Sequence, residues 1–170
     1  MVMAWDKGLD FENTYNKIAR HMHKAKAQAK CYDAILLIQL RNGSRVSEAV
    51  RAFKEFLHSK SVEVEVQVSK KRAKQEKRLM VIPQELLRLV STCFDLRNVE
   101  DKTLVNRVKN YCIETYGFNT HSLRYAFITY LLRQGVNPSI VAKITRHSRL
   151  EYIQRYTQER VAEEILRNIP

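Results

Sequence analysis

Apolar residues at helical spacing run through most of the chain. Phe11, Tyr15 and Ile18 follow this spacing directly after Asp10, whose side chain is suited to cap a helix N-terminus. A second helix is predicted over residues 27–40. Its apolar run is nearly continuous, so this helix is expected to lie at the centre of the core.

The next helix follows a tight turn at Asn42 and Gly43, since glycine suits a left-handed C-cap. Ser44 is expected to cap it, which puts Arg45 in its first turn. The helix dipole disfavours a cation there, so Arg45 needs an anion nearby, and Glu48 one turn later is a candidate. The apolar face of this helix comprises Val46, Ala49, Val50, Phe53, Phe56 and Leu57.

A β-hairpin is predicted in the middle of the chain. Residues 62–68 alternate strictly between apolar and polar, and residues 78–82 read as the partner strand. Residues 69–78 between them contain six Lys or Arg and one Glu. Such a run is usually a solvated loop, and it also suits contact with a phosphate backbone.

The rest of the chain is predicted to be helical. The expected helices cover about 83–93, 100–116, 120–134, 138–144, 149–157 and 158–168. In the helix that begins at Pro138, the inner face is expected to be Ile140, Val141 and Ile144.

The fold class is therefore mainly α with a small antiparallel β-hairpin (α+β), in one domain. Its parts are expected to be helices over 10–60, a basic hairpin over 61–83, helices over 84–157 and a last helix over 158–170.

Composition narrows the function. The 170 residues carry 30 Lys and Arg against 18 Asp and Glu, a formal charge of +12, which favours a polyanionic partner such as nucleic acid. No apolar run approaches the roughly 20 residues of a membrane span, so no membrane partner is expected. Three widely spaced cysteines, Cys31, Cys93 and Cys112, are expected to be buried thiols of an intracellular protein.

Five residues form a candidate site for phosphodiester chemistry. Two arginines, Arg45 and Arg124, can bracket a phosphate, and His121 and His147 can donate to its oxygens or move a proton. Tyr156 offers a hydroxyl nucleophile. Together such groups could cleave a phosphodiester and store its bond energy in a phosphotyrosyl link.

The order and spacing of these residues resemble the catalytic domain of the tyrosine recombinase (phage-type integrase) family. The motifs are Asn42-Gly43-Ser44-Arg45-Val46-Ser47-Glu48, His121-Ser122-Leu123-Arg124, Arg146-His147-Ser148 and Gln154-Arg155-Tyr156. The 23 positions from Arg124 to His147 and the 9 from His147 to Tyr156 are typical of that family. Arg146 stands where glycine is usual, and Tyr125 where a histidine is common.

The resemblance implies a role for each residue. Arg45 and Arg124 would hold the scissile phosphate, His121 and His147 would assist at its oxygens, and Tyr156 would be the nucleophile. It also implies a hairpin lysine as general acid. Lys70, Lys71, Lys74 and Lys77 compete for this role, and Lys71 has the expected phase on the strand. DNA contacts are expected from Lys70, Arg72, Lys74, Lys77, Arg78 and Arg146.

The resemblance also implies partners. The substrate would be double-stranded DNA, no cofactor would be needed, and the protein would form a tetramer on DNA through the amphipathic C-terminal helix. A cytoplasmic, nucleoid-associated location is expected. The family's N-terminal DNA-clamping domain is not found in the sequence, so the chain is expected to be a catalytic fragment or a reduced recombinase.

Two alternatives remain open. Relaxation of DNA in the manner of a type IB topoisomerase uses similar residues without strand exchange. A DNA-binding regulator without catalysis would read residues 138–157 as a helix-turn-helix. That interpretation leaves Arg45 and the His121–Arg124 pair without a purpose.

Overall fold

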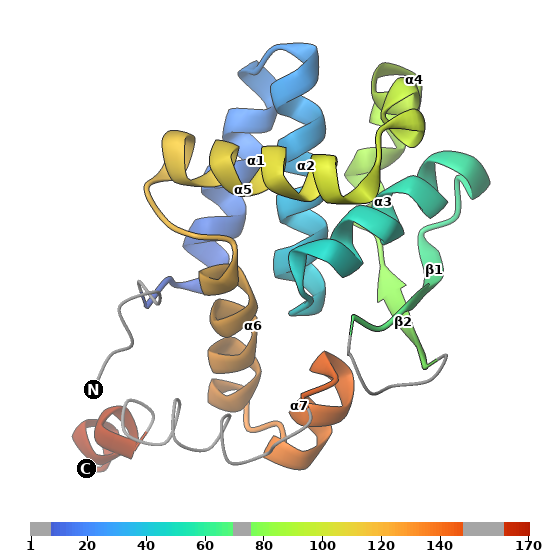
Figure 1. Ribbon diagram of the computed structural model, residues 1–170. Coiled ribbons are helices and arrows are strands. Elements are labelled where there is room, and N and C mark those ends of the chain that lie inside the picture. The colour runs from blue at the N-terminus through green and yellow to red at the C-terminus, as the bar shows by residue number, and fades with distance from the viewer. Residues whose placement is uncertain (1–7, 70–75, 148–161) are drawn as a thin grey trace.

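The computed structural model describes residues 8–69, 76–147 and 162–170. It is mainly α-helical with one antiparallel strand pair, as predicted (Figure 1). The elements in order are α1 (Phe11–Lys24), α2 (Ala27–Asn42), α3 (Val46–Ser59), β1 (Glu63–Gln67), β2 (Lys77–Val81), the 3-10 helix η1 (Gln84–Leu89), α4 (Val90–Cys93), the 3-10 helix η2 (Phe94–Asn98), α5 (Asp101–Tyr116), α6 (His121–Arg133) and α7 (Pro138–Thr145). Residues 162–168 are also helical.

Helix α2 is the centre of the core, as its apolar run predicted. Every residue from Cys31 to Leu40 is buried, and α1, α3 and α6 pack around it. The predicted caps are also present. The Asp10 carboxylate accepts a hydrogen bond from the Asn13 amide at 2.9 Å, and Gly43 ends α2 in the left-handed conformation. The predicted cap at the start of α1 and the predicted glycine at the end of α2 are therefore both confirmed.

The side chain of Asn42 holds the hairpin to the end of α2. The Asn42 amide donates to the Val81 carbonyl at 2.8 Å, and its Oδ1 accepts from the Val81 amide at 2.8 Å. These two bonds satisfy the backbone carbonyl and amide of Val81, and they place β2 next to the turn that carries Arg45. The inner face of the hairpin, with Val64 and Met80 opposite each other, packs into the core.

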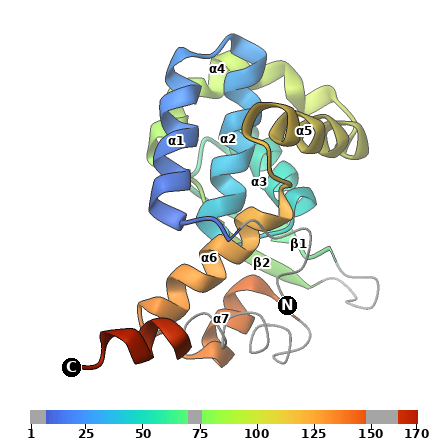
Figure 2. The same cartoon turned by 90° about the vertical axis from the view of Figure 1, so that its left-hand side faces the viewer.

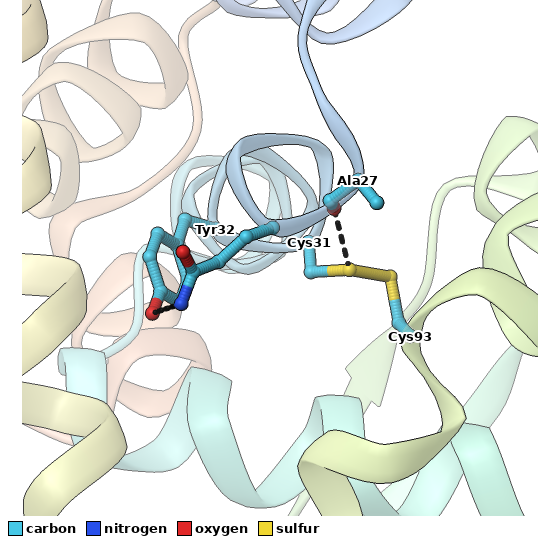
Figure 3. The surroundings of a disulfide bond; sticks show 5 residues. Ala27, Cys31, Tyr32 and Cys93 are labelled. Carbon is cyan, nitrogen blue, oxygen red and sulfur yellow. Dashed lines mark hydrogen bonds between the residues drawn. A yellow bond between two sulfur atoms is a disulfide. The ribbon is translucent and has the colours of Figure 1, made fainter.

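The segment after the hairpin differs from the single helix expected over 83–93. It forms η1, α4 and η2 in succession, and a disulfide joins Cys31 in α2 to Cys93 at the end of α4 (Figure 3). The expectation of three free thiols is therefore wrong for this pair, whose Cα atoms lie 5.7 Å apart although 62 positions separate them in sequence. Cys112 is a buried free thiol, as expected, and burial followed by the Asp33 charge raises its pKa to about 12.

A buried carboxylate fixes α5 against α1 and α2. Asp33 is fully buried and accepts hydrogen bonds from the hydroxyls of Tyr111 at 2.9 Å and Tyr116 at 2.6 Å. The His21 Nδ1 atom lies 2.8 Å from the same carboxylate. Figure 1 shows α5 running across α2, and the short segment 117–120 connects it to α6, so this network helps to position the start of α6.

Helices α6 and α7 form a second, smaller packing unit below the main core (Figure 2). Its buried centre is Tyr125, Ile128 and Val141. The predicted inner face of α7 is correct only for Val141, because Ile140 is 51% exposed and Ile144 is 40% exposed. Apolar spacing could not show this, since α7 packs mainly against one neighbour, α6, and so buries a narrow stripe.

The helix over 162–168 approaches α6 through an ion pair between Arg133 and Glu164, at 2.8 Å. The predicted helix over 149–157 lies outside the described residues. Among the helices that the structure describes, none combines the length and hydropathy needed to cross a membrane.

Candidate active site

The turn between α2 and α3 presents Arg45. The structure makes Arg45 itself the N-cap of α3, so the expectation that Ser44 caps this helix is wrong. The Ser44 hydroxyl instead donates to the Arg45 carbonyl at 3.1 Å, and the capping acceptor is Glu48, which takes a hydrogen bond from the Arg45 amide at 3.3 Å. This arrangement follows from the position of Glu48 three residues into the helix, where a carboxylate can reach back to the cap.

Glu48 also binds three further donors, and it is fully buried. Its carboxylate accepts from the Arg45 guanidinium at 3.3 Å, the Ser69 amide at 3.0 Å and the Arg78 guanidinium at 3.2 Å. Burial alone would raise the pKa of Glu48, but the Ser69 hydrogen bond and the charges of Arg78 and Arg45 outweigh it, so the pKa lies below its ordinary value. The predicted pairing of Arg45 with Glu48 is confirmed.

Arg124 is the largest fully buried side chain in the described structure. Its guanidinium donates to the Gly43 carbonyl at 3.0 Å, and a second nitrogen lies 3.1 Å from His147 Nδ1. Burial, followed by the nearby charge of Arg45, lowers the pKa of Arg124 to about 9, which leaves it charged at neutral pH. Arg124 therefore joins the Arg45 turn to the segment after α7.

His147 is held from several sides. Its backbone amide donates to the Ala142 carbonyl at 3.1 Å, and its ring Nδ1 lies 2.8 Å from the Thr145 hydroxyl and 3.1 Å from Arg124. The preceding residue, Arg146, is in the left-handed conformation, which explains why glycine would suit this position. The Arg146 guanidinium forms an ion pair with Glu76 at 2.8 Å and so ties this turn to the start of β2.

His121 begins α6 and lies next to Arg124 and Arg45. Its ring is partly exposed, but partial burial and then the charges of Arg124, Arg45 and Lys109 lower its pKa from 6.5 to about 4. At neutral pH the ring is therefore neutral, with one donor and one acceptor nitrogen.

We expect this shift to be visible by NMR. In the free protein the His121 ring should titrate near pH 4, well below the free value of 6.5, because partial burial and then the neighbouring cations oppose its protonation. A bound phosphate would offset the charge of these cations, so adding duplex DNA should raise the pH at which His121 titrates. Resonances can be assigned with His121→Gln. A midpoint near 6.5 without DNA would show that the cations do not act on this ring.

Gly43 is required for both its conformation and its size. Its φ is +57°, and a Cβ added there would lie 2.1 Å from Phe127 Cδ1, far inside contact distance. Its carbonyl is also the acceptor for Arg124. An alanine would thus displace either the α6 residue Phe127 or the turn that holds Arg124.

We expect Gly43→Ala to lower the free energy of unfolding by about 3 kcal/mol, from left-handed strain together with overpacking. The position of Arg124 should shift as well, because the Gly43 carbonyl accepts its hydrogen bond. Gly135→Ala is the matched control: its φ is +81°, but no described atom outside its own neighbours lies within 4 Å of the added Cβ. Urea unfolding should show only about 1 kcal/mol for that control. Equal losses in the two variants would rule out the Phe127 contact.

The structure brings four of the six predicted catalytic residues together: Arg45, His121, Arg124 and His147. Tyr156 and Lys71 lie outside the described residues, as do Lys70, Arg72 and Lys74.

The predicted DNA contacts that the structure describes have different surroundings. Lys77 is exposed on β2 and Arg146 is half-buried beside Glu76. Arg78, by contrast, is only 3% exposed and binds Glu48 and the Asn42 carbonyl, so its placement among surface DNA contacts is corrected. The alternation of side chains along β2 puts Arg78 on the same buried face as Met80. This indicates burial, but the surrounding run of charged residues made a surface position the more obvious prediction.

Two residues with a part in the site were missed from the sequence. Gln39 donates from one amide nitrogen to the carbonyls of Ser44 at 3.2 Å and Thr120 at 2.9 Å, and so links the starts of α3 and α6. Its signal was a polar residue inside the apolar run of α2. Lys109 lies on α5 and acts electrostatically on His121, which no local pattern indicates. The described residues contain no cluster of three or more His, Cys, Asp or Glu suited to a metal ion.

A helical domain with a small hairpin, and with two arginines and two histidines close together, is the arrangement that the family resemblance implies. The chain belongs to the phage integrase family, whose model matches residues 11–163.

Individual relatives agree with this. A candidate integrase of Acidianus two-tailed virus, ORF241, is 38% identical over 170 residues, covering 98% of this chain and 69% of the relative. The uncharacterized protein MJ0770 of Methanocaldococcus jannaschii is 32% identical, covering 98% and 89%. A candidate integrase of Sputnik virophage, V10, is 31% identical, covering 95% and 88%.

Among solved structures, XerA recombinase has a similar fold, with a TM-score of 0.60 at 17% sequence identity. The match covers 95% of this chain and 64% of the XerA chain, so this chain spans less than two thirds of that structure. At this identity the likeness concerns the fold alone.

Proposed function

We propose that the protein cuts and rejoins DNA strands as a site-specific recombinase, with Tyr156 as the nucleophile. The observation that carries the proposal is the connection of two arginines through one turn: Arg124 binds the Gly43 carbonyl, two residues from Arg45, and also contacts His147. A phosphate placed between these groups would meet two guanidinium groups and two imidazoles.

The buried surroundings favour this use. Arg45 is tethered by Glu48 yet its side chain keeps 29% of its surface exposed, so it can meet a ligand while its orientation is fixed. Arg124 and the neutral His121 supply donors that are already in place before charge develops on the phosphate. Fixed donors in a partly dry site stabilise a charged transition state more than solvated ones would.

In the proposed step, the Tyr156 oxygen attacks the scissile phosphorus and passes its proton to the acceptor nitrogen of the neutral His121 ring. A bond forms between this oxygen and phosphorus, the bond from phosphorus to the 5′ oxygen breaks, and a 3′-phosphotyrosyl link results. The leaving 5′ oxygen takes a proton, which Lys71 of the hairpin would supply. Attack by a 5′ hydroxyl on the phosphotyrosine reverses the step and rejoins the strand, with no cofactor consumed.

Assembly on DNA would use the C-terminal helix. The segment 162–170 exposes Ile165 at 57%, Leu166 at 71% and Ile169 at 63%. An apolar surface of this kind on a short terminal helix suits docking on a neighbouring protomer. We place the tetramer contact there. The viral integrases among the relatives make insertion or excision of a mobile element the natural setting.

Covalent trapping tests the proposal. The protein is incubated with a pool of nicked duplexes of random sequence and denatured, and the DNA that stays attached to protein is sequenced. We expect an adduct that Tyr156→Phe abolishes and that Tyr152→Phe, the nearby matched control, retains. An adduct that persists in Tyr156→Phe would overturn the assignment of the nucleophile. If no duplex gave an adduct, the result would favour the alternative that the protein is a DNA-binding regulator without catalysis.

A second assay separates recombination from relaxation. Two recovered duplexes that carry different labels are mixed, and products that join a strand of one to a strand of the other are counted. Joined products are expected for a recombinase. Relaxation of supercoiled DNA without joined products would identify the topoisomerase activity instead.

A further inference from the structure

A cleft of about 500 Å³ opens beside the active site, between the start of α3, the face of α5 and the segment that leads into α6. Arg45 and His121 line one side of it, and Lys109 and Ile113 line the other. Since the first two residues belong to the proposed phosphate site, the cleft is continuous with that site. Its size lies in the range of small-molecule sites.

A buried polar side chain, Gln39, lies at the base of this cleft. Gln39 is only 1% exposed and lines the cleft, and its Oε1 has no hydrogen-bond partner among the described residues. The amide cannot be turned around, because its nitrogen already donates to the carbonyls of Ser44 and Thr120. Its Oε1 is therefore one of the few buried acceptors that stay unsatisfied among the described residues, and it marks a polar position beneath the cleft.

The α5 wall combines an apolar surface with a cation. Val105, Lys109 and Ile113 recur every four residues and so share one face of the helix. Ile113 is 54% exposed and Lys109 is exposed, which leaves both accessible from the cleft. The Asp33 network holds α5 in place. A rigid wall with one ammonium beside an apolar side chain suits a sugar–phosphate unit.

We infer that this cleft binds the nucleotide adjacent to the scissile phosphate. Lys109 binds the phosphate of that nucleotide, and its deoxyribose lies against Ile113. The inference rests on the proposed function, since it takes the scissile phosphate to lie on Arg45 and His121. The contact is to the backbone, so it adds affinity without reading sequence.

Salt-dependent DNA binding tests this inference. The Tyr156→Phe protein is used throughout, so that no cleavage occurs, and the probe is a 30-base-pair duplex of arbitrary sequence. Lys109→Gln should make the log–log salt slope shallower by about 0.9, the value for one lost phosphate contact. Between 0.05 and 0.2 M salt, the affinity advantage of the parent should therefore shrink about threefold.

Arg107→Gln is the control with the same loss of charge, because Arg107 is exposed on α5 two positions away and does not line the cleft. Its slope should equal that of the parent. An unchanged slope in Lys109→Gln, or an equal change in both variants, would overturn the inference.

A blocking variant checks the cleft itself. Ile113→Trp would fill it without a change in charge, and the exposure of Ile113 allows the fold to persist, as circular dichroism can verify. We expect the same reduction in slope, and no further reduction on adding Lys109→Gln, since both remove one contact. Additive reductions would place Lys109 outside the cleft. These readouts need no cleavage, so they fail or succeed separately from the adduct assay.

Discussion

Glu48→Gln should lower the free energy of unfolding by about 3–5 kcal/mol, because it leaves a buried arginine without its counterion. Arg78 is 3% exposed and its ion pair is with Glu48, at 3.2 Å. The neutral amide that replaces the carboxylate would also turn donors toward the Ser69 amide and Arg45, which themselves donate. Urea unfolding at pH 7 measures the loss.

The pH dependence should identify the charge as the cause. The pKa of Glu48 in the folded state lies below its ordinary value of 4.5. A lowered pKa stabilises the protein above the unfolded value, and this contribution is lost as pH falls through the folded value. The gap between parent and Glu48→Gln should therefore be full at pH 7 and narrow progressively below about pH 4.5.

Two variants serve as controls. Glu65→Gln removes a carboxylate that is exposed on β1, and its effect should stay within about 0.5 kcal/mol. Adding Arg78→Met to Glu48→Gln removes the orphaned charge and should restore part of the stability. If Glu48→Gln were no worse than Glu65→Gln, the buried cluster would not contribute to folding. Because Glu48 also tethers Arg45, the proposed DNA cleavage should fall in this variant even where it remains folded.

The sequence predicted helices and strands well where one local signal decides the structure. Asp10, Gly43 and the alternation of residues 62–68 each determine an end or a periodicity within a few residues. The segment 83–98 was harder, because the hydrogen bonds of 3-10 helices leave no distinct apolar period. The exposure of Ile140 was also hidden, since apolar spacing cannot distinguish a core from an uncovered face.

The candidate site also has a part that the sequence predicts and a part that only the structure shows. The motifs named Arg45, His121, Arg124 and His147, and the structure brings them together. The sequence could not show that Arg124 is buried against the Gly43 carbonyl, since that contact joins residues 81 positions apart. The alternation of β2 indicates the inward direction of Arg78, but its partner Glu48, 30 positions earlier, depends on the tertiary structure. The sequence motifs thus predict which residues carry the chemistry, whereas the contacts that hold these residues depend on tertiary structure.

The disulfide between Cys31 and Cys93 should contribute about 4 kcal/mol to stability, by the chain-entropy relation for a loop of 62 residues. Without this cross-link the unfolded chain can adopt more conformations, because Cys31 and Cys93 no longer have to lie close together. Both cysteines are at most 2% exposed, so a reductant should reach them only slowly in the folded protein. The effect should therefore be measured by unfolding in denaturant with and without reductant.

Thiol counting gives the direct measurement. Denatured, unreduced protein should present one thiol, from Cys112, and reduced protein should present three. The double variant Cys31→Ala and Cys93→Ala should have the lower stability and be insensitive to reductant, whereas Cys112→Ala should keep its sensitivity. The bond joins α4 to the start of α2, whereas Arg124 contacts the turn after the end of α2, so the proposed DNA cleavage should persist in the reduced protein at temperatures where it remains folded. Three thiols before reduction would show that the cross-link does not form, and α4 would then be held by packing alone.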